Sequence, residues 1–455
     1  MTNSWTYKLS EFVAGANYKD FSPDVKETAK RAILDTVGVA FAGAREGISA
    51  IACALADEER CSGDATIIGT SKRSSVLNCA FCSGVIFHAL DFDDSYYDYD
   101  SPTRLHPSSP ILAACFALAE KLRASGQAFL EAFVVGFEVT GALNRGLGPS
   151  HYGRGWHATS TLGTFGATAA ASKLLKLPRE QIQVAFGTAA SLASGTRQNV
   201  GTMVKPLHVG HAARNGALAA LLSSRGSTAD KNIFDEEMGF ALFSDRSDWR
   251  PSRAFESLGS PWAIVQPGIR VKRYPSCGGT HKALDALFHI LGNSRLHAND
   301  VEKVTVFVPE YPKALIHPRP QTGLQGKFSM GYCLSAGIID GHVGIQSFTD
   351  SAVLRPKPQA LLRKVEVVER PCAGDSSVEV RIHCRGGSEF SAKTLHSPGS
   401  PFNPLTWSEL EQKFNECVQT IMPPEYPPKL IERIKSFEQL ESLSVLTDML
   451  RNSVS

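Results

Sequence analysis

Hydrophobic residues recur every three or four positions over most of the first 260 residues, which is the spacing of helices with a buried face. In residues 21–44, FSPDVKETAKRAILDTVGVAFAGA, apolar side chains such as Val25, Ile33 and Val37 share one face. Ser22 stands where an N-cap is expected, and a proline follows it at the first helical position. This segment is therefore predicted to be a helix.

Further helical patterns follow, and they carry alanine, glycine and serine on several faces. Small side chains on several faces are what closely packed helices need when other helices surround them. The pattern predicts an all-helical domain whose first part covers residues 1–265. The runs lie at residues 109–126, 128–148, 160–178, 179–195 and 210–226.

The pattern changes near residue 265, where apolar and polar residues begin to alternate in the manner of strands. Alternating segments at 301–308, 363–369 and 377–394 predict strands, and Gly386-Gly387 predicts a hairpin turn within the last one. Two helical patterns, THKALDALFHILGN and KFSMGYCLSAGIIDG, belong to the same region. We predict a mainly α protein in which a smaller α+β lid domain, residues 266–397, is inserted. Residues 398–455 are again helical and are expected to return to the all-helical domain.

Composition narrows the class of protein. The 455 residues include 47 Lys and Arg against 45 Asp and Glu, a net charge of +2, and no basic run is long enough to predict nucleic-acid binding. The N-terminus lacks the features of a secretory or transit peptide, and no window approaches 18 uninterrupted apolar residues. We expect a cytoplasmic protein with no membrane partner. Its ten cysteines are expected to be reduced, and the single CxxC at Cys79 and Cys82 is too little for a zinc site.

One acidic stretch is conspicuous, HALDFDDSYYDYDSPTRLHP at residues 88–107. Five aspartates occupy ten positions between His88 and His106. Charge runs of this kind are usually solvated loops. However, the apolar run before Asp91 indicates that this first carboxylate is drawn toward the interior, where its pKa would be perturbed. The spacing does not match a calcium-binding EF-hand loop.

Three further stretches place cationic or titratable residues at helix starts or glycine turns. His157 precedes an Ala/Gly-rich helix whose first turn offers hydroxyls and backbone N–H groups to an anion. Lys205 precedes a proline at another helix start, with His208 one turn further on. Lys272 lies in a basic segment before Gly278-Gly279, and His281 opens the next helix. A purely structural role for each histidine is the alternative.

These residue types together fit a particular chemistry. Cations can neutralise a di- or tricarboxylate while a histidine or aspartate moves a proton on the carbon beside a carboxylate. No dinucleotide loop, phosphate-binding loop, nucleophile elbow or zinc motif is present, so the sequence predicts neither an organic cofactor nor a metal.

The same stretches, in the same order, resemble the MmgE/PrpD family of 2-methylcitrate dehydratases, cis-aconitate decarboxylases and an iminodisuccinate epimerase. The motifs are DFDD followed by HPS, GWHATSTLG, MVKPLH, YPSCGGTH with a following aspartate, and KFSMGYC with a following DG and FTD. The resemblance runs from about residue 5 to the C-terminal helices. It implies a homodimer with a cofactor-free site in a cleft between a helical domain and a lid.

The resemblance also implies roles for individual residues. His106, His157 and Asp91 correspond to catalytic positions: one of the two histidines is the acid/base, and Asp91 orients a histidine. Lys205 and His281 are expected to bind substrate carboxylates. His208 and Lys272 are further candidates for substrate binding.

One departure from the family pattern bears on the substrate. The chain carries SYYDYDSPTRL between DFDD and HPS, a longer segment than in the decarboxylases, and Ser95 stands where a threonine is usual. The added tyrosines and aspartates weigh against a trianionic substrate unless Arg104 turns inward. Asp98 and Asp100 are expected to belong to a solvated insertion.

Three functions therefore remain. The leading one is a lyase that decarboxylates or dehydrates a citrate- or aconitate-like acid. The second is an epimerase or isomerase that returns the proton to the opposite face of a dicarboxylate such as iminodisuccinate. The third is a carboxylate-binding protein without catalytic activity.

Overall fold

The computed structural model describes residues 4–61, 63–96, 105–312, 314–371, 375–419 and 421–454. Within them the chain forms two compact units. Unit 1 comprises Met1–Asn199, Met203–Val271 and Thr406–Ser455, and unit 2 comprises Val200–Thr202 and Lys272–Leu405. The sequence-based prediction of Asp98 and Asp100 as a solvated insertion lies outside the described residues, as does Arg104.

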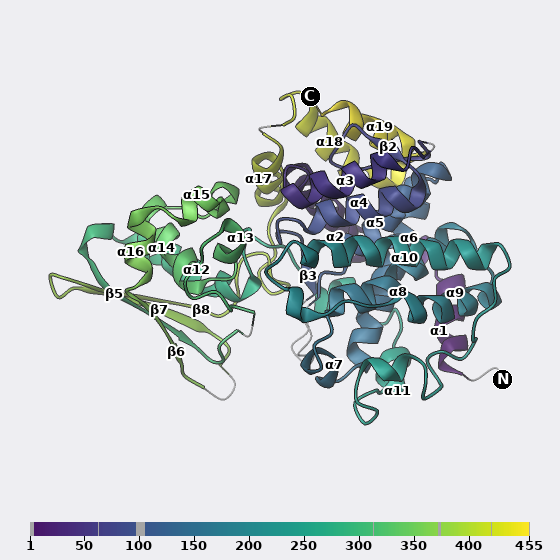
Figure 1. Cartoon of the computed structure of the whole chain (residues 1–455), viewed down its shortest axis with the longest axis horizontal. Helices are drawn as coiled ribbons and strands as arrows, with labels where there is room; N and C mark the ends of the chain where they lie inside the picture. The colour runs from purple at the N-terminus through teal and green to yellow at the C-terminus, as the bar shows by residue number, and fades with distance from the viewer. Residues whose placement is uncertain are drawn as a thin grey trace. The chain divides into compact units, whose positions relative to one another are not determined.

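Unit 1 is built from helices, which confirms the mainly α class (Figure 1). Its only described strands are two-residue pairs: β1 (Ala65–Thr66) with β2 (Arg73–Ser74), and β3 (Ser95–Tyr96) with β4 (Ile269–Arg270). Its helices are α1 (Trp5–Gly15), α2 (Pro23–Gly43), α3 (Gly47–Glu58), α4 (Val76–His88), α5 (Ser108–Lys121), α6 (Gly126–Gly146), α7 (Ser150–Gly153), α8 (Ala158–Leu174), α9 (Arg179–Leu192), α10 (Val204–Ser224), α11 (Pro251–Phe255), α17 (Trp407–Val418), α18 (Tyr426–Lys435) and α19 (Ser444–Asn452).

Helix α6 is long and apolar enough to cross a membrane by length and composition, and 83% of its most apolar window is buried inside the structure. The bent pair α2 and α3 passes the same test only if the two helices are counted as one span. Core helices of globular proteins pass this test too, so it is weak support for a span.

Glycines allow α4 and α10 to cross closely. A Cβ atom on Gly84 would lie 2.9 Å from the Cα atom of Gly210, and a Cβ atom on Gly210 would lie 2.6 Å from the carbonyl oxygen of Phe81. Only residues without a side chain fit there. The crossing brings the C-terminal end of α4, at His88, next to the N-terminal end of α10, at Lys205.

The C-terminal helices return to unit 1, where α17 and α18 pack on α2. Figure 1 shows these yellow helices beside the purple N-terminal ones. Lys413 on α17 forms a buried ion pair with Asp35 on α2, with nitrogen and oxygen 2.5 Å apart. Its Nζ atom also donates a hydrogen bond to the carbonyl oxygen of Phe92, at 2.9 Å. Helix α17 is thus hydrogen-bonded to the loop that contains Asp91.

We expect Lys413→Met to lower the free energy of unfolding by about 3–5 kcal/mol, because it leaves the buried carboxylate of Asp35 without its cation. The side chains of Lys413 and Asp35 are 6% and 0% exposed. Lys121→Met is the matched control. Its partner is Asp64, and both side chains of that pair are substantially exposed, so a change of about 0–1 kcal/mol is expected. Urea unfolding measures both, and equal losses would contradict the prediction.

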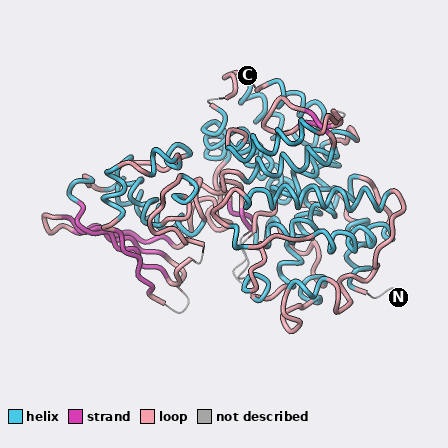
Figure 2. The backbone as a smooth tube through the Cα atoms, in the orientation of Figure 1, coloured by secondary structure: helices cyan, strands magenta, loops and turns pink. Residues whose placement is uncertain are grey.

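Unit 2 consists of a four-stranded sheet with helices on one face (Figure 2). The strand order is β6-β5-β7-β8, with β5 parallel to β6 and antiparallel to β7. Gly387 has a positive φ of 80° at the β7–β8 turn, as the Gly-Gly pair predicted. The strands are β5 (Val301–Val308), β6 (Val365–Glu369), β7 (Val378–Cys384) and β8 (Glu389–Thr394), and the helices are α12 (His281–Asn293), α13 (Gly323–Gly326), α14 (Met330–Asp340), α15 (Asp350–Val353) and α16 (Pro356–Leu362).

Candidate active site

Five of the seven residues predicted for the site lie in unit 1, and the structure brings them into one buried cluster. They come from the loop after α4, the segment before α5, the start of α8 and the first turns of α10. The five are Asp91, His106, His157, Lys205 and His208. The other two, Lys272 and His281, belong to unit 2.

Lys205 lies at the centre of the cluster and is 7% exposed. Its Nζ atom is 2.7 Å from Oδ1 of Asp91 and 2.7 Å from Nε2 of His88. An ammonium group can only donate, so Nε2 of His88 must accept. The helix start places the lysine as the sequence predicted, with Pro206 in the first turn of α10.

His88 is consequently a neutral ring with its proton on Nδ1. Nδ1 lies 2.9 Å from both carboxylate oxygens of Asp93 and donates to them. Burial, followed by the positive charge of Lys205, lowers the pKa of His88 to about 4, although Asp93 opposes the shift. A carboxylate, an imidazole and an ammonium group therefore form a chain from Asp93 through His88 to Lys205.

Asp91 has a strained backbone, with φ at 52° in the left-handed region. Such an angle is uncommon outside glycine, although Asp and Asn tolerate it better than other residues. The carboxylate is 7% exposed and pairs with Lys205. Backbone strain at a buried, paired carboxylate is typical of functional sites.

His106 lies between two carboxylates. Its Nε2 atom is 3.5 Å from Oδ1 of Asp91, and its Nδ1 atom is 3.4 Å from Oδ2 of Asp93. Its backbone N–H donates to the hydroxyl of Thr159 on α8, at 3.1 Å. A protonated His106 would have a carboxylate at each ring nitrogen.

Asp93 and Asp94 are adjacent and fully buried, but the pKa values of their side chains are shifted in opposite directions. Burial alone would raise the pKa of Asp93, but His88 and His106 hold it well below the usual range, and the hydroxyl of Ser109 also donates to it. Burial raises the pKa of Asp94 well above its usual range, despite a hydrogen bond from Ser108. The surroundings thus favour the charged form of Asp93 and the protonated form of Asp94.

His157 is the N-cap of α8 and contacts His208 through its ring. The two Nδ1 atoms are 3.0 Å apart. Burial, followed by the charge of Lys205, lowers the pKa of both rings, that of His208 to about 4. The sequence predicted that the hydroxyls of this helix start face an anion, but Thr159 accepts from His106, and Ser160 donates to the backbone of His208.

In unit 2, His281 is buried and opens α12 as predicted. Its Nε2 atom is 3.3 Å from the carbonyl oxygen of Ser276, and its ring packs edge-on against Tyr274. The hydroxyl of Tyr274 donates to Asp285, at 2.8 Å. Tyr274 thus contacts Asp285 through its hydroxyl and His281 through its ring. Lys272 is 2% exposed.

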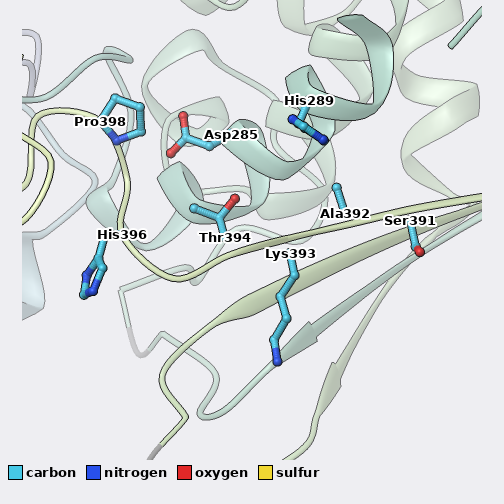
Figure 3. A pocket seen from close by; sticks show the side chains of 8 residues that line it. All are labelled: Asp285, His289, Ser391, Ala392, Lys393, Thr394, His396 and Pro398. Carbon is cyan, nitrogen blue, oxygen red and sulfur yellow. The ribbon is translucent and has the colours of Figure 1, made fainter. Parts of the chain in front are cut away.

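Unit 2 also contains a separate pocket of about 310 Å³ between α12 and β8 (Figure 3). Asp285 and His289 line it from the helix, and residues 391–394 line it from the strand. None of the seven predicted site residues lines this pocket.

Four residues of the cluster offer ligand atoms within 4.8 Å of one another, as a metal site would: His88, Asp91, Asp93 and His106. Lys205, however, contacts both His88 and Asp91. Its positive charge would repel a divalent cation from the same atoms. The arrangement is better described as an ion-pair cluster than as a metal centre.

Sequence reasoning did not assign a role to His88, Asp93, Ser108 or Ser109. The available signal was their position: His88 and Asp93 flank Asp91, and the two serines directly follow His106 and a proline. The contacts between them depend on how α4 and α5 pack, which no local pattern reveals.

The lowered pKa values predict that acid destabilises the protein. Histidines that stay neutral when folded become protonated when unfolded, so stability is fully present above pH 6.5 and is lost as pH falls toward about 4. The four buried histidines concerned are His88, His151, His157 and His208. Each of these histidines lowers the free energy of unfolding by at most about 1.4 kcal/mol per pH unit.

Urea midpoints at pH 7, 6 and 5 measure this effect. His151 lies outside the cluster and is in hydrogen-bond contact with Phe243 and Thr161. His151→Gln removes one of the four histidines, so the free energy of unfolding should fall less steeply with decreasing pH than in the wild type. Constant stability from pH 7 to pH 5 would contradict the prediction.

Comparison with known proteins decides the family. The sequence model of the MmgE/PrpD N-terminal domain matches residues 7–251, and that of the MmgE/PrpD C-terminal domain matches residues 274–437. The chain belongs to the MmgE/PrpD family. The resemblance inferred from the ordered motifs is thereby confirmed.

Curated members of the MmgE/PrpD family match over almost the whole chain. The cis-aconitate decarboxylase of Homo sapiens is 30% identical, over 99% of this chain and 95% of that protein. A cis-aconitate decarboxylase-like protein of Aspergillus oryzae is 27% identical, over 97% and 96%. The cis-aconitate decarboxylase of Aspergillus terreus is 25% identical, over 98% and 95%.

Proposed function

We propose that the protein is a lyase that decarboxylates cis-aconitate or a closely related acid, with no cofactor. One observation carries the proposal: a buried lysine, four histidines and two buried aspartates meet at the ends of four helices, in a chain whose full-length relatives are named cis-aconitate decarboxylases. A homodimer and a cytoplasmic location stay predictions from the sequence.

The reaction needs one cation and one proton. The C–C bond to the leaving carboxylate breaks and releases CO2, and its electron pair moves through the double bond to the carbon beside another carboxylate. That carbon then takes one proton, so the product has one negative charge fewer than the substrate. A cation beside the carboxylate that accepts the charge lowers the barrier.

We assign these tasks from the surroundings of each residue. Lys205 is the cation, and Asp91 and the His88–Asp93 pair hold its ammonium group in place. His106 is the candidate proton donor, because a carboxylate lies near each of its two ring nitrogens. We infer that Lys272 and His281 bind the remaining carboxylates, as their positions in the family pattern imply.

A second function has one observation in its favour. His157 is held neutral, which suits a base, while His106 suits an acid. Two groups of opposite character are what an epimerase or a dehydratase needs in order to remove a proton and return one elsewhere.

Proton NMR of the purified protein in heavy water separates these functions. The panel is cis-aconitate, 2-methylcitrate, citrate and iminodisuccinate, each followed over time. New vinyl signals from cis-aconitate, with one deuterium in the product, support the decarboxylase. Deuterium exchange into recovered iminodisuccinate without net product would overturn it in favour of an epimerase, and binding of all four without reaction would leave a carboxylate-binding protein.

A further inference from the structure

The contact between His157 and His208 restricts which of their ring nitrogens can carry a proton. Their Nδ1 atoms are 3.0 Å apart, so one of the two must carry a hydrogen and the other must offer its lone pair. Two facing N–H groups would clash. Each neutral imidazole has one N–H, and hence only two arrangements of the neutral pair exist.

The two arrangements differ at the other end of His157. When His208 donates through its Nδ1–H, the proton of His157 must be on Nε2, which can then hydrogen-bond a substrate carboxylate. When His208 accepts, Nε2 of His157 is bare and can take a proton. A third proton places hydrogens on both Nε2 atoms and leaves the Nδ1–H···Nδ1 bond intact, so the two rings share the positive charge.

The surrounding backbone keeps the rings in this contact. The N–H of His157 donates to the carbonyl oxygen of Gly195, at 3.0 Å. An added Cβ on Gly195, whose φ is 117°, would meet Ser160 at 2.8 Å and the ring of His208 at 3.4 Å. His208 is 7% exposed. The loop at Gly195 thus packs on one ring and holds the backbone of the other.

We propose that His208 is a positioning residue for His157: the two rings share one proton between their Nδ1 atoms, and His208 thereby decides whether Nε2 of His157 carries a proton. This assigns His208 a task different from the substrate binding expected from the sequence, and it rests on the proposed function. The charged and titratable groups that act on the pair are Lys205 and His211 on α10, His88 at the end of α4, and His106 before α5.

Nitrogen-15 NMR of histidine-labelled protein tests the hydrogen bond without any turnover. In the wild type at pH 7.5, one ring of the pair should show a protonated Nδ1 hydrogen-bonded to a bare Nδ1. The signals are assigned by their loss in His157→Gln and His208→Asn. In His208→Leu, which removes the partner, His157 should be free to take the ordinary Nε2–H form. Two rings with bare, unbonded Nδ1 atoms in the wild type would overturn the proposal.

Kinetics with cis-aconitate give a second, independent reading. His208→Leu should lower kcat by about 10–100-fold and shift the acid limb of the kcat profile to lower pH, because a protonated His157 loses its acceptor. His208→Asn keeps a donor and an acceptor near Nδ1 and should recover most of the loss. His342→Leu, which replaces an exposed histidine of unit 2, is the control and should stay near wild type.

The outcomes distinguish the two proposals. If Leu and Asn at position 208 lower kcat equally and leave the pH profile unchanged, His208 has only a structural role and the inference fails. If the NMR signature is present but cis-aconitate is not consumed, the proposed function fails while the shared proton stands.

Discussion

Replacing Lys205 by methionine is expected to lower kcat/KM for cis-aconitate by about a thousandfold, the upper end of what one lost electrostatic stabiliser costs. Methionine keeps most of the length of the side chain but removes the ammonium group that contacts Asp91 and His88. Both the developing negative charge of the substrate and the buried carboxylate of Asp91 then lack their cation. Steady-state kinetics measures the loss, and a value within threefold of wild type would refute the assignment.

A folding defect must be separated from a catalytic one, because breaking a buried ion pair is itself destabilising by about 3–5 kcal/mol. Lys205→Arg serves this purpose. It retains the charge but replaces a compact ammonium with a planar group, so it should fold better than Lys205→Met while recovering little activity. Urea unfolding of both variants, with exposed Lys121→Met as control, shows whether activity follows stability.

The second large effect is expected at Asp91. Asp91→Asn should lower kcat by about 100-fold or more, because the amide keeps the shape and tolerates the positive φ but offers no negative charge to Lys205 or to the nearby ring of His106. Loss of function with an intact backbone would identify the charge as the cause.

Asp94 supplies the matched control three residues away. Burial raises its pKa well above the usual range, which favours the protonated form, and an amide is close in shape to that form. Asp94→Asn should therefore retain activity within about threefold and be at least as stable as wild type at neutral pH, where a buried acid with a raised pKa costs stability. Similar losses from Asp91→Asn and Asp94→Asn would contradict the assignment of charges.

The sequence also predicts that Asp98→Asn and Asp100→Asn together leave turnover near wild type. The comparison with Asp91→Asn tests the expected division of the acidic stretch into one functional carboxylate and a solvated insertion. A collapse of the double variant to the level of Asp91→Asn would remove that distinction.

Local features of the fold were predictable from the sequence. The alternation in VEKVTVFV predicts β5 at its observed bounds, and Gly386-Gly387 predicts the turn between β7 and β8. Ser22 is the N-cap of α2, and its side chain accepts from Val25. These features depend on residues a few positions apart, whose periodicity and capping chemistry act within one element.

The family and a list of candidate residues also came from the sequence, because ordered motifs can be recognised without knowing what they touch. Helices α8 and α10 show why the contacts could not be predicted. Both are apolar or small on almost every face, so no single stripe indicates which neighbour each face meets.

Only the tertiary structure decided how the candidates act on one another. His88 and Lys205 are 117 residues apart in the chain, and His157 and His208 are 51 apart, yet each pair is in hydrogen-bond contact. The first contact depends on Gly84 and Gly210, which let α4 and α10 cross. The sequence alone determined the helical and strand elements, the family and the residue types. Packing determined in which direction the pKa of each buried aspartate is shifted, which nitrogen of His88 carries its proton and which histidines are in contact, because burial and distance set these properties.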